Sequence, residues 1–302
     1  MNATLGQCGG ETGQNNTQNK THDSVLQFSC HGATLFGILS APAQAATRGV
    51  LVAVGGPQYR AGSHRQFTLL ARDLAAGGVP VLRFDYRGMG DSEGAPRTFE
   101  SVSDDLRAAI DAFFKAQPAL ESVVLWGLCD GACAALFHAP DDARVSGLVL
   151  LNPWVQTEAG QARAQLKHYY LARLTAPQFW LKIAAGNFNY VAAAHSLRET
   201  IARLVKPATK PGSDANDMAA TALPEKMRTS LARFNGQVLL ILSGQDLTAK
   251  EFLDTVARCG DWQKLLRAPR VTRHELAAAD HTFSRREWRD QVARWTAAWM
   301  GF

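Results

Sequence analysis

The sequence is poor in cysteine, and the five cysteines that it has form no recognisable cluster. Cys8, Cys30, Cys129, Cys133 and Cys259 are odd in number and show neither a C-x-x-C pair nor the spacing of zinc ligands. This pattern argues against a disulfide framework and a metal site, and it favours a reducing compartment. The sequence also lacks a phosphate-binding loop and a nucleotide-binding fingerprint. We therefore expect no cofactor.

Long apolar runs and blocks of like charge are missing as well. No stretch reaches the roughly 18 apolar residues that a membrane-spanning helix needs. The formal net charge of +5 comes from 32 basic and 27 acidic residues scattered along the chain. These features argue against stable membrane insertion and nucleic-acid binding. The first 24 residues are polar and contain no apolar secretion signal, so we expect a disordered tail on a cytoplasmic protein.

From residue 25 onward, short apolar runs alternate with longer amphipathic patterns. Such alternation is typical of an α/β fold, in which helices cover a parallel sheet. We expect a mostly parallel eight-stranded sheet that opens with a hairpin. The expected strands are residues 25–28, 33–42, 49–56, 79–86, 122–127, 145–153, 237–244 and 271–278. Residues 64–78 and 98–118 are expected to form crossover helices, the second with Thr98 as its N-cap.

The stretch 153–233 does not fit this alternation, because it is far too long for a connection between a helix and a strand. It contains the apolar segment FWLKIAAGNFNYV and the polar segment KPATKPGSDAND. We interpret it as a helical cap inserted over the candidate site. The chain then divides into a tail (1–24), a core (25–152 and 234–302) and the cap (153–233).

Cys129 is the candidate nucleophile. The segment GLCDG follows the apolar run SVVLW and precedes the small-residue helix ACAALF, which places the thiol in a sharp turn. The flanking glycines permit a strained backbone, and the start of the following helix favours a thiolate. A thiolate attacks a carbonyl carbon with less help from a base than a serine needs. The alternative is that Cys129 is a small buried hydrophobic residue in a tight turn.

His281 is the best candidate base among the eight histidines. It lies in the loop AADHTFS, after the last expected strand and before the terminal helix REWRDQVARWTAAW. The other histidines lie in the N-terminal part, at or within helical stretches, or inside a strand. A histidine in those places is more often a structural residue than a catalyst.

Asp246 is the candidate acid that orients the imidazole and stabilises its charged form. It is the first acid after the seventh expected strand, at the carboxyl end, where the loop can reach His281. Glu251 and Asp254 fall in the next helix and are expected to be solvated. Asp280 adjoins His281 and is expected to shape the loop.

The segment GGPQYRAGSHRQ after the third expected strand is the candidate source of an oxyanion-hole donor. Pro57 cannot donate a hydrogen bond, so the N–H of Gly56 is the candidate, with Gln58 as runner-up. Its partner is the N–H of Asp130, just after the nucleophile. A plain tight turn is the alternative. The Asp130 carboxylate would oppose a neighbouring thiolate unless it points away and is paired.

Several polar side chains are expected at the same carboxyl edge of the sheet. Gln58 and Arg60 are the candidate substrate-binding residues, suited to an anionic or hydroxylated substrate. The segment RFDYRGMGDSEG follows the fourth expected strand and is interpreted as scaffold. Its Asp85 and Arg87 can pair or cap, and its glycines allow a tight loop.

With these residues assembled, the chain resembles the α/β-hydrolase superfamily over about residues 25–302. DYRGMGDS matches the D-x-R-G-x-G-x-S loop of that superfamily. VGGPQ is similar to the HGGPG of proline iminopeptidase-like members, with Val54 in place of the histidine, and GLCDG resembles the cysteine elbow of dienelactone hydrolases. The resemblance implies the α/β-hydrolase fold and its chain order of nucleophile, acid and histidine, which Cys129, Asp246 and His281 follow.

Four segments together indicate a narrower group within this superfamily. GGPQYRAGSHRQF, FDYRGMGDSEG, WGLCDGA and LNPWVQT together resemble the type 1 hydrolase associated with the exosortase A system. Those are bacterial proteins encoded with machinery for exopolysaccharide production. The resemblance implies a bacterial cytoplasmic hydrolase and does not supply its substrate, while the cysteine argues against ordinary peptidase or lipase activity.

Together these residues predict a hydrolase that acts on an ester or thioester through an acyl-cysteine intermediate. The expected partner is a small-molecule or saccharide-linked acyl substrate, and the sequence leaves the oligomeric state open. An acyltransferase with a sugar hydroxyl as acceptor would use the same residues. The other alternative is a noncatalytic binding protein that keeps the fold, supported by the cysteine in place of serine.

Overall fold

The computed structural model describes residues 21–56, 58–155 and 214–302, with the side chains of the last range described from Leu223 onward. Within these residues eight strands form one sheet in the order β1-β2-β4-β3-β5-β6-β7-β8. Their bounds are β1 His22–Cys30, β2 Ala33–Ala41, β3 Arg48–Ala53, β4 Val81–Phe84, β5 Ser122–Leu128, β6 Val145–Leu151, β7 Gln237–Ser243 and β8 Val271–Leu276. β1, β2 and β4 pair antiparallel, and the pairs from β4 to β8 are parallel. The predicted mostly parallel eight-stranded sheet is confirmed.

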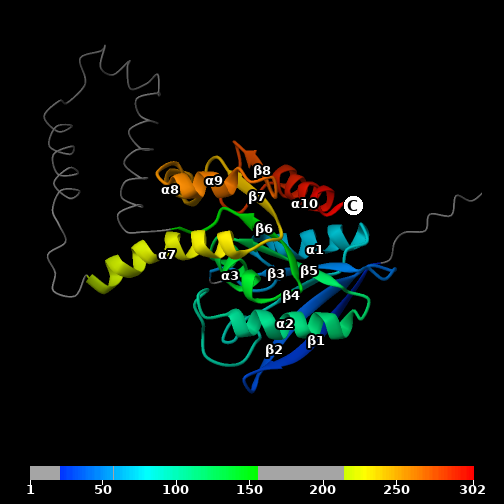
Figure 1. Cartoon of the computed structure of the whole chain (residues 1–302). Coiled ribbons are helices and arrows are strands. Elements are labelled where there is room, and N and C mark those ends of the chain that lie inside the picture. Colours follow the sequence, from blue (N-terminus) through cyan, green and yellow to red (C-terminus); the bar gives the residue numbers. More distant parts are fainter. Residues whose placement is uncertain (1–20, 57, 156–213) are drawn as a thin grey trace, which may run out of the picture.

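Helices cover both faces of this sheet (Figure 1). Their bounds are α1 Gln66–Ala76, α2 Ser103–Ala116, α3 Asp130–His138, α7 Asp214–Arg233, α8 Leu247–Ala257, α9 Gly260–Leu266 and α10 Arg286–Met300, with short 3-10 helices η1 Ser63–Arg65 and η2 Ala139–Asp141. α1 packs against α10, whereas α3 contacts α2 and α7, and α7 reaches α9. A sheet enclosed in this way has strands that are buried on both sides.

The central strands show this burial in their composition. Residues 238–242 of β7 are an unbroken apolar run, and each of them is at most 1% exposed. β1, at the edge of the sheet, instead alternates exposed and half-buried residues. The parallel direction of the inner strands brings their carboxyl ends to one edge. The segments that follow β3, β5, β6, β7 and β8 therefore meet there, as predicted.

Two predicted boundaries are wrong. β1 begins at His22, so residues 22–24 belong to the sheet, whereas residues 1–20 of the predicted tail lie outside the described residues. α2 begins at Ser103 with Val102 as N-cap, so Thr98 does not cap it. The Thr98 carbonyl instead accepts from the N–H of Ser101 at 2.9 Å and closes a turn before the helix.

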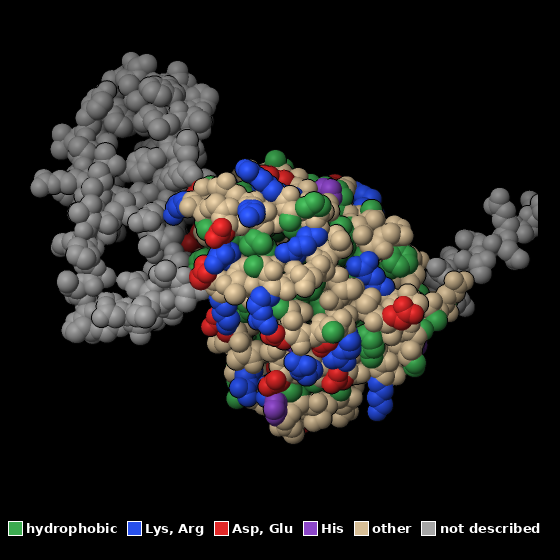
Figure 2. All heavy atoms as spheres, viewed as in Figure 1, with side chains coloured by type: hydrophobic (Ala, Val, Ile, Leu, Met, Phe, Trp, Pro, Cys, Tyr) green, Lys and Arg blue, Asp and Glu red, His purple; other side chains and the backbone are tan. Residues whose placement is uncertain are grey.

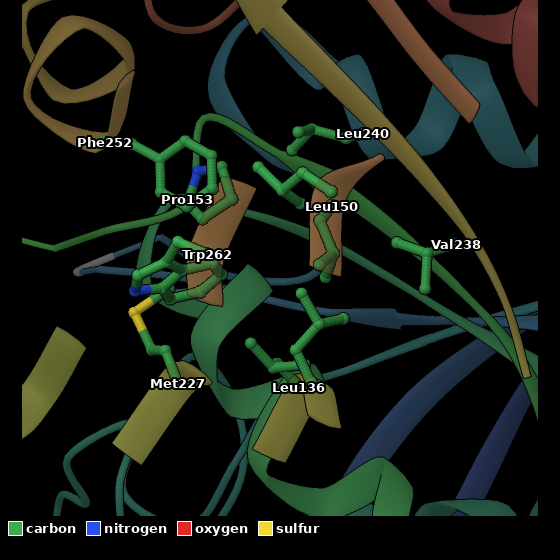
Figure 3. A pocket seen from close by; sticks show the side chains of 10 residues that line it. Leu136, Leu150, Pro153, Met227, Val238, Leu240, Phe252 and Trp262 are labelled. Atoms are coloured by element: carbon green, nitrogen blue, oxygen red, sulfur yellow. The ribbon is translucent and has the colours of Figure 1, made fainter. Parts of the chain in front are cut away.

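Most of the predicted cap, residues 156–213, lies outside the described residues. The C-terminal half of α7 was predicted as part of this cap, but it packs into the core. Met227 and Leu231 are at most 1% exposed, and the Met227 sulfur is 3.9 Å from the Cys133 sulfur in α3. Beside them lies an apolar cavity of about 10 Å³, where Met227 faces Trp262 (Figure 3). This cavity is too small to hold an acyl group.

Basic and acidic side chains are interspersed on the face of the molecule shown in Figure 2. Pairs on the described surface include Arg228 with Glu225 and Arg144 with Asp111. This face therefore carries no extended patch of one charge. None of the helices in the described ranges combines the length and apolar character that crossing a bilayer requires.

We expect Leu231→Ala to lower the free energy of unfolding by about 2–5 kcal/mol, because the side chain is buried and its loss leaves a cavity. Leu247→Ala is the matched control, since Leu247 is 44% exposed, and its change should stay within about 0.5 kcal/mol. Urea unfolding measures both. Equal, small changes would show that this half of α7 is not part of the core.

Candidate active site

Cys129 occupies the turn between β5 and α3, with φ 61° and ψ −123°. A residue with a side chain is strained in such a conformation by about 1–3 kcal/mol, and it persists only where neighbours fix the backbone. The Cys129 N–H donates to the Leu151 carbonyl at 2.9 Å, and the Cys129 carbonyl accepts from the Trp154 N–H at 3.3 Å. The end of β6 thus holds the turn from both sides, while the cysteine stays partly exposed.

The two glycines around Cys129 allow close packing of strand and helix. A Cβ on Gly127 would lie 2.4 Å from the Gly131 carbonyl oxygen, and a Cβ on Gly131 would lie 2.4 Å from the Ala53 carbonyl oxygen. Carbon and oxygen cannot approach so closely without displacing the backbone. β3, β5 and α3 can therefore meet only where these side chains are absent. The strand, turn and helix predicted around Cys129 are present.

His281 lies in the loop between β8 and α10, and Asp246 lies between β7 and α8. The His281 Nδ1 is 2.9 Å from the Asp246 Oδ2. The Asp246 carboxylate also caps α8, accepting from the N–H groups of Thr248 and Ala249 at 3.1 Å each. A carboxylate fixed by two backbone donors has little rotational freedom, so it orients the imidazole that binds it.

The alternative acids make other contacts. The Asp280 carboxylate accepts from the backbone N–H of Ser284 at 3.0 Å and from its hydroxyl, so it shapes the histidine loop as expected. Glu251 is only 5% exposed within α8, and the expectation that it is solvated is wrong. Asp246 is the predicted acid that the structure brings to His281.

The electrostatics of His281 favour a charged imidazole. Burial alone lowers its pKa, but hydrogen bonds to Asp246 and Cys129, together with their negative charges, raise the pKa to about 10. Near neutral pH the ring is then an imidazolium. An imidazolium beside a cysteine is the environment in which cysteine nucleophiles are found.

Asn152, at the end of β6, is fully buried and was not predicted as a site residue. Its Nδ2 donates to the Ser243 hydroxyl at 2.8 Å and to the His281 carbonyl at 2.9 Å, and its Oδ1 accepts from the Ser243 N–H at 2.9 Å. One amide therefore links β6, β7 and the histidine loop. The adjoining Leu151 accepts the hydrogen bond from the Cys129 N–H. The end of β6 therefore fixes the position of Cys129 relative to the His281 loop. The sequence offered one signal that could have identified Asn152: it follows the end of a strand, as the other site residues do.

Gly56 and Asp130, the predicted oxyanion-hole donors, lie beside the Cys129 turn, and the Asp130 carboxyl group packs against Gly55. The N–H groups of Gly56 and Gly131 stabilise its charged form. Its Oδ1 lies against Gly55, where an added Cβ would be only 2.2 Å away. Burial nevertheless raises the pKa of this carboxyl overall.

Gln58 and Arg60 hold their own loop. The Gln58 Oε1 accepts from the Ser63 N–H at 3.2 Å. Arg60 forms ion pairs with the buried Asp85 and with Asp91, and only 17% of its side chain is exposed. Two carboxylates therefore balance the charge of Arg60 and hold its side chain against the loop that follows β4. Contact of either residue with substrate stays a prediction.

The scaffold loop after β4 pairs as expected. Besides Asp85, which binds Arg60, Arg87 forms a buried ion pair with Asp105. These ion pairs fasten the loop after β4 to the segment that carries Arg60 and to α2, which carries Asp105.

The model of the alpha/beta hydrolase family matches residues 32–295. The chain belongs to the alpha/beta hydrolase family. Protein ABHD12B of Homo sapiens is 37% identical over 109 residues, covering 33% of this chain and 29% of that protein. The polyketide transferase grgF of Penicillium sp is 32% identical over 92 residues, covering 29% of this chain and 31% of that protein. The chain thus spans less than a third of the length of these curated relatives.

Solved structures resemble this alpha/beta hydrolase over nearly its whole length. The esterase Pf2001 of Pyrococcus furiosus has a TM-score of 0.60 at 16% identity, covering 93% of this chain and 94% of that chain. A dienelactone hydrolase of Anabaena variabilis has a TM-score of 0.57 at 15% identity, covering 93% of this chain and 97% of that chain. At such identities the likeness shows the fold alone.

We expect Asn152→Ala to slow alkylation of Cys129 by iodoacetamide about tenfold near neutral pH. Loss of a hydrogen bond worth about 1–1.5 kcal/mol frees the His281 loop, and less thiolate is then held by the imidazolium. Mass spectrometry of the labelled cysteine gives the rate as a function of pH.

Ser243→Ala is the matched control, because it removes the hydroxyl partner of the same amide and leaves the bond to His281. It should keep the alkylation profile of the wild type. An equal loss in both variants would show that Asn152 only fastens the two strands.

Proposed function

We propose that this alpha/beta hydrolase cleaves an ester or thioester through Cys129, His281 and Asp246. One observation carries the proposal: the strained cysteine, the histidine that hydrogen-bonds it and the acid that orients this histidine converge at the carboxyl edge of the sheet. A residue that only filled the core would require neither a partly exposed thiol nor an imidazole held at both nitrogens.

Acylation uses each of these groups. The Cys129 thiolate attacks the substrate carbonyl carbon, a carbon–sulfur bond forms, and the carbonyl π electrons move to the oxygen. The N–H groups of Gly56 and Asp130 are the proposed donors to this oxyanion. When the C=O bond re-forms, the bond to the leaving group breaks, and His281 supplies the proton that the leaving alcohol or thiol takes. Asp246 keeps the ring oriented throughout.

Deacylation reverses the role of the histidine. The now neutral His281 removes a proton from water, whose oxygen attacks the thioester carbonyl. Collapse of the second oxyanion breaks the carbon–sulfur bond, releases the carboxylic acid and returns the thiolate and imidazolium. No metal ion is needed for either step.

We infer that the substrate is a small-molecule or saccharide-linked acyl compound of a bacterial cytoplasm. The support is the joint resemblance of GGPQYRAGSHRQF, FDYRGMGDSEG, WGLCDGA and LNPWVQT to the exosortase-associated hydrolase. The four cysteines in the described ranges are free thiols, in keeping with a reducing compartment.

Brief exposure to p-nitrophenyl esters and acyl thioesters should leave one acyl group on the wild type and none on Cys129→Ala, as read by intact-protein mass spectrometry. Cys259→Ala is the matched control, because it removes another partly exposed thiol and should acylate like the wild type. His281→Ala should acylate about 10²–10⁴-fold more slowly. An adduct that persists in Cys129→Ala, or absence of any adduct across the panel, would contradict the proposal.

Acyl transfer to a hydroxyl is the second candidate function, favoured by the similarity to grgF, a polyketide transferase. If alcohols can take the acyl group from Cys129, added glycerol or sorbitol should divert product from free acid to ester in proportion to the polyol concentration. Product analysis by chromatography gives the ratio, and a ratio that polyols leave unchanged would assign the chain to hydrolysis.

A further inference from the structure

β8 is the last strand of the sheet, so one of its two edges is free among the described residues (Figure 1). The Arg270 carbonyl accepts from the Val238 N–H at 2.8 Å. The Leu276 carbonyl accepts from the Gly244 N–H at 2.9 Å. In a parallel ladder every second residue of a strand faces the same neighbour, so the even-numbered residues of β8 face β7. The residues between them, such as Arg273, direct their N–H and C=O groups out of the sheet.

The free edge of β8 carries charges of both signs. A free strand edge pairs readily with another chain, and many proteins protect such edges with lysines. β8 instead has Arg273 and Glu275, which are two residues apart and therefore lie on the same face of the strand. The Arg273 Nη2 is 3.3 Å from the Glu275 Oε2, and the two side chains are 42% and 48% exposed. An ion pair this exposed contributes little within one copy, so its partners can be exchanged at little cost.

This pattern is self-complementary. When two copies of β8 run antiparallel with His274 opposite His274, Arg273 of each copy lies opposite Glu275 of the other. Both residues carry outward N–H and C=O groups, so each Arg273–Glu275 pair forms two backbone hydrogen bonds. Their Cβ atoms are then about 5 Å apart, within reach of an ion pair. Sliding one copy by two residues places arginine opposite arginine or glutamate opposite glutamate, so the charges favour a single register.

An aromatic pair lies beside the same edge. The His274 ring stacks on Trp295 of α10, with ring centroids 4.3 Å apart and planes 9° from parallel. Both side chains are only half-buried. Because His274 would lie next to the twofold axis that relates the paired strands, two such stacks meet there and bury ring surface. The edge therefore offers apolar contact in addition to hydrogen bonds and charge.

We infer that this protein forms a dimer of two identical chains through antiparallel pairing of β8, which joins the two eight-stranded sheets into one. The other end of the sheet does not offer the same pairing. β1 contains Asp23 but no arginine or lysine, so two copies of it lack charge complementarity. Assembly through β8 is independent of the chemistry proposed for Cys129.

Sedimentation velocity over a micromolar concentration series should give the wild type twice the chain mass of 32.8 kDa. Arg273→Glu and Glu275→Arg should each raise the dimer dissociation constant at least about 100-fold, because each places two pairs of like charges opposite each other. Arg107→Glu is the matched control. It reverses an exposed arginine on α2, which packs against β1 at the other end of the sheet, and should dimerise like the wild type.

An equimolar mixture of Arg273→Glu and Glu275→Arg should form a heterodimer, because the acidic edge of one variant then faces the basic edge of the other. The double variant Arg273→Glu/Glu275→Arg should dimerise like the wild type for the same reason. Recovery of the dimer also shows that both variants fold.

A monomeric wild type, a dimer that both single reversals leave intact, or a mixture that stays monomeric would overturn the inference. A loss in Arg107→Glu equal to that in Arg273→Glu would also overturn it, because the loss would then not depend on the edge of β8.

Discussion

Two hydrogen bonds between Cys129 and the end of β6 fix the backbone on which the rest of the site is built. They join the Cys129 N–H to Leu151 and its carbonyl to Trp154. The positive φ of the turn presents the thiol at the edge of the sheet, and the same β6 segment carries Asn152, which holds the histidine loop. If these two hydrogen bonds were lost, Cys129 and His281 would no longer be held by the same segment.

The charges of the site are balanced around one cation. His281 binds Asp246 and Cys129, and its charge also reaches Asp130. Its raised pKa follows from this surplus of acidic neighbours over the cost of burial.

Much of the fold could be predicted because the central strands are continuous apolar runs. β5, β6 and β7 are buried on both faces, and such runs between helices have few other interpretations. Boundaries were less certain where local signals were ambiguous. Thr98 has the side chain of an N-cap, but it closes a turn five residues before α2, because several polar residues in that stretch can serve either role.

The sequence by itself determined the order of strands and helices, and it marked Cys129, Asp246 and His281, because each stands at a strand end where chemistry is expected. Only the tertiary structure decided which groups meet. Asn152 contacts a carbonyl 129 residues later, and the Asp130 carboxyl oxygen packs against Gly55. Neither could be predicted, because the contacts of a side chain depend on segments brought together by folding and not on its sequence neighbours.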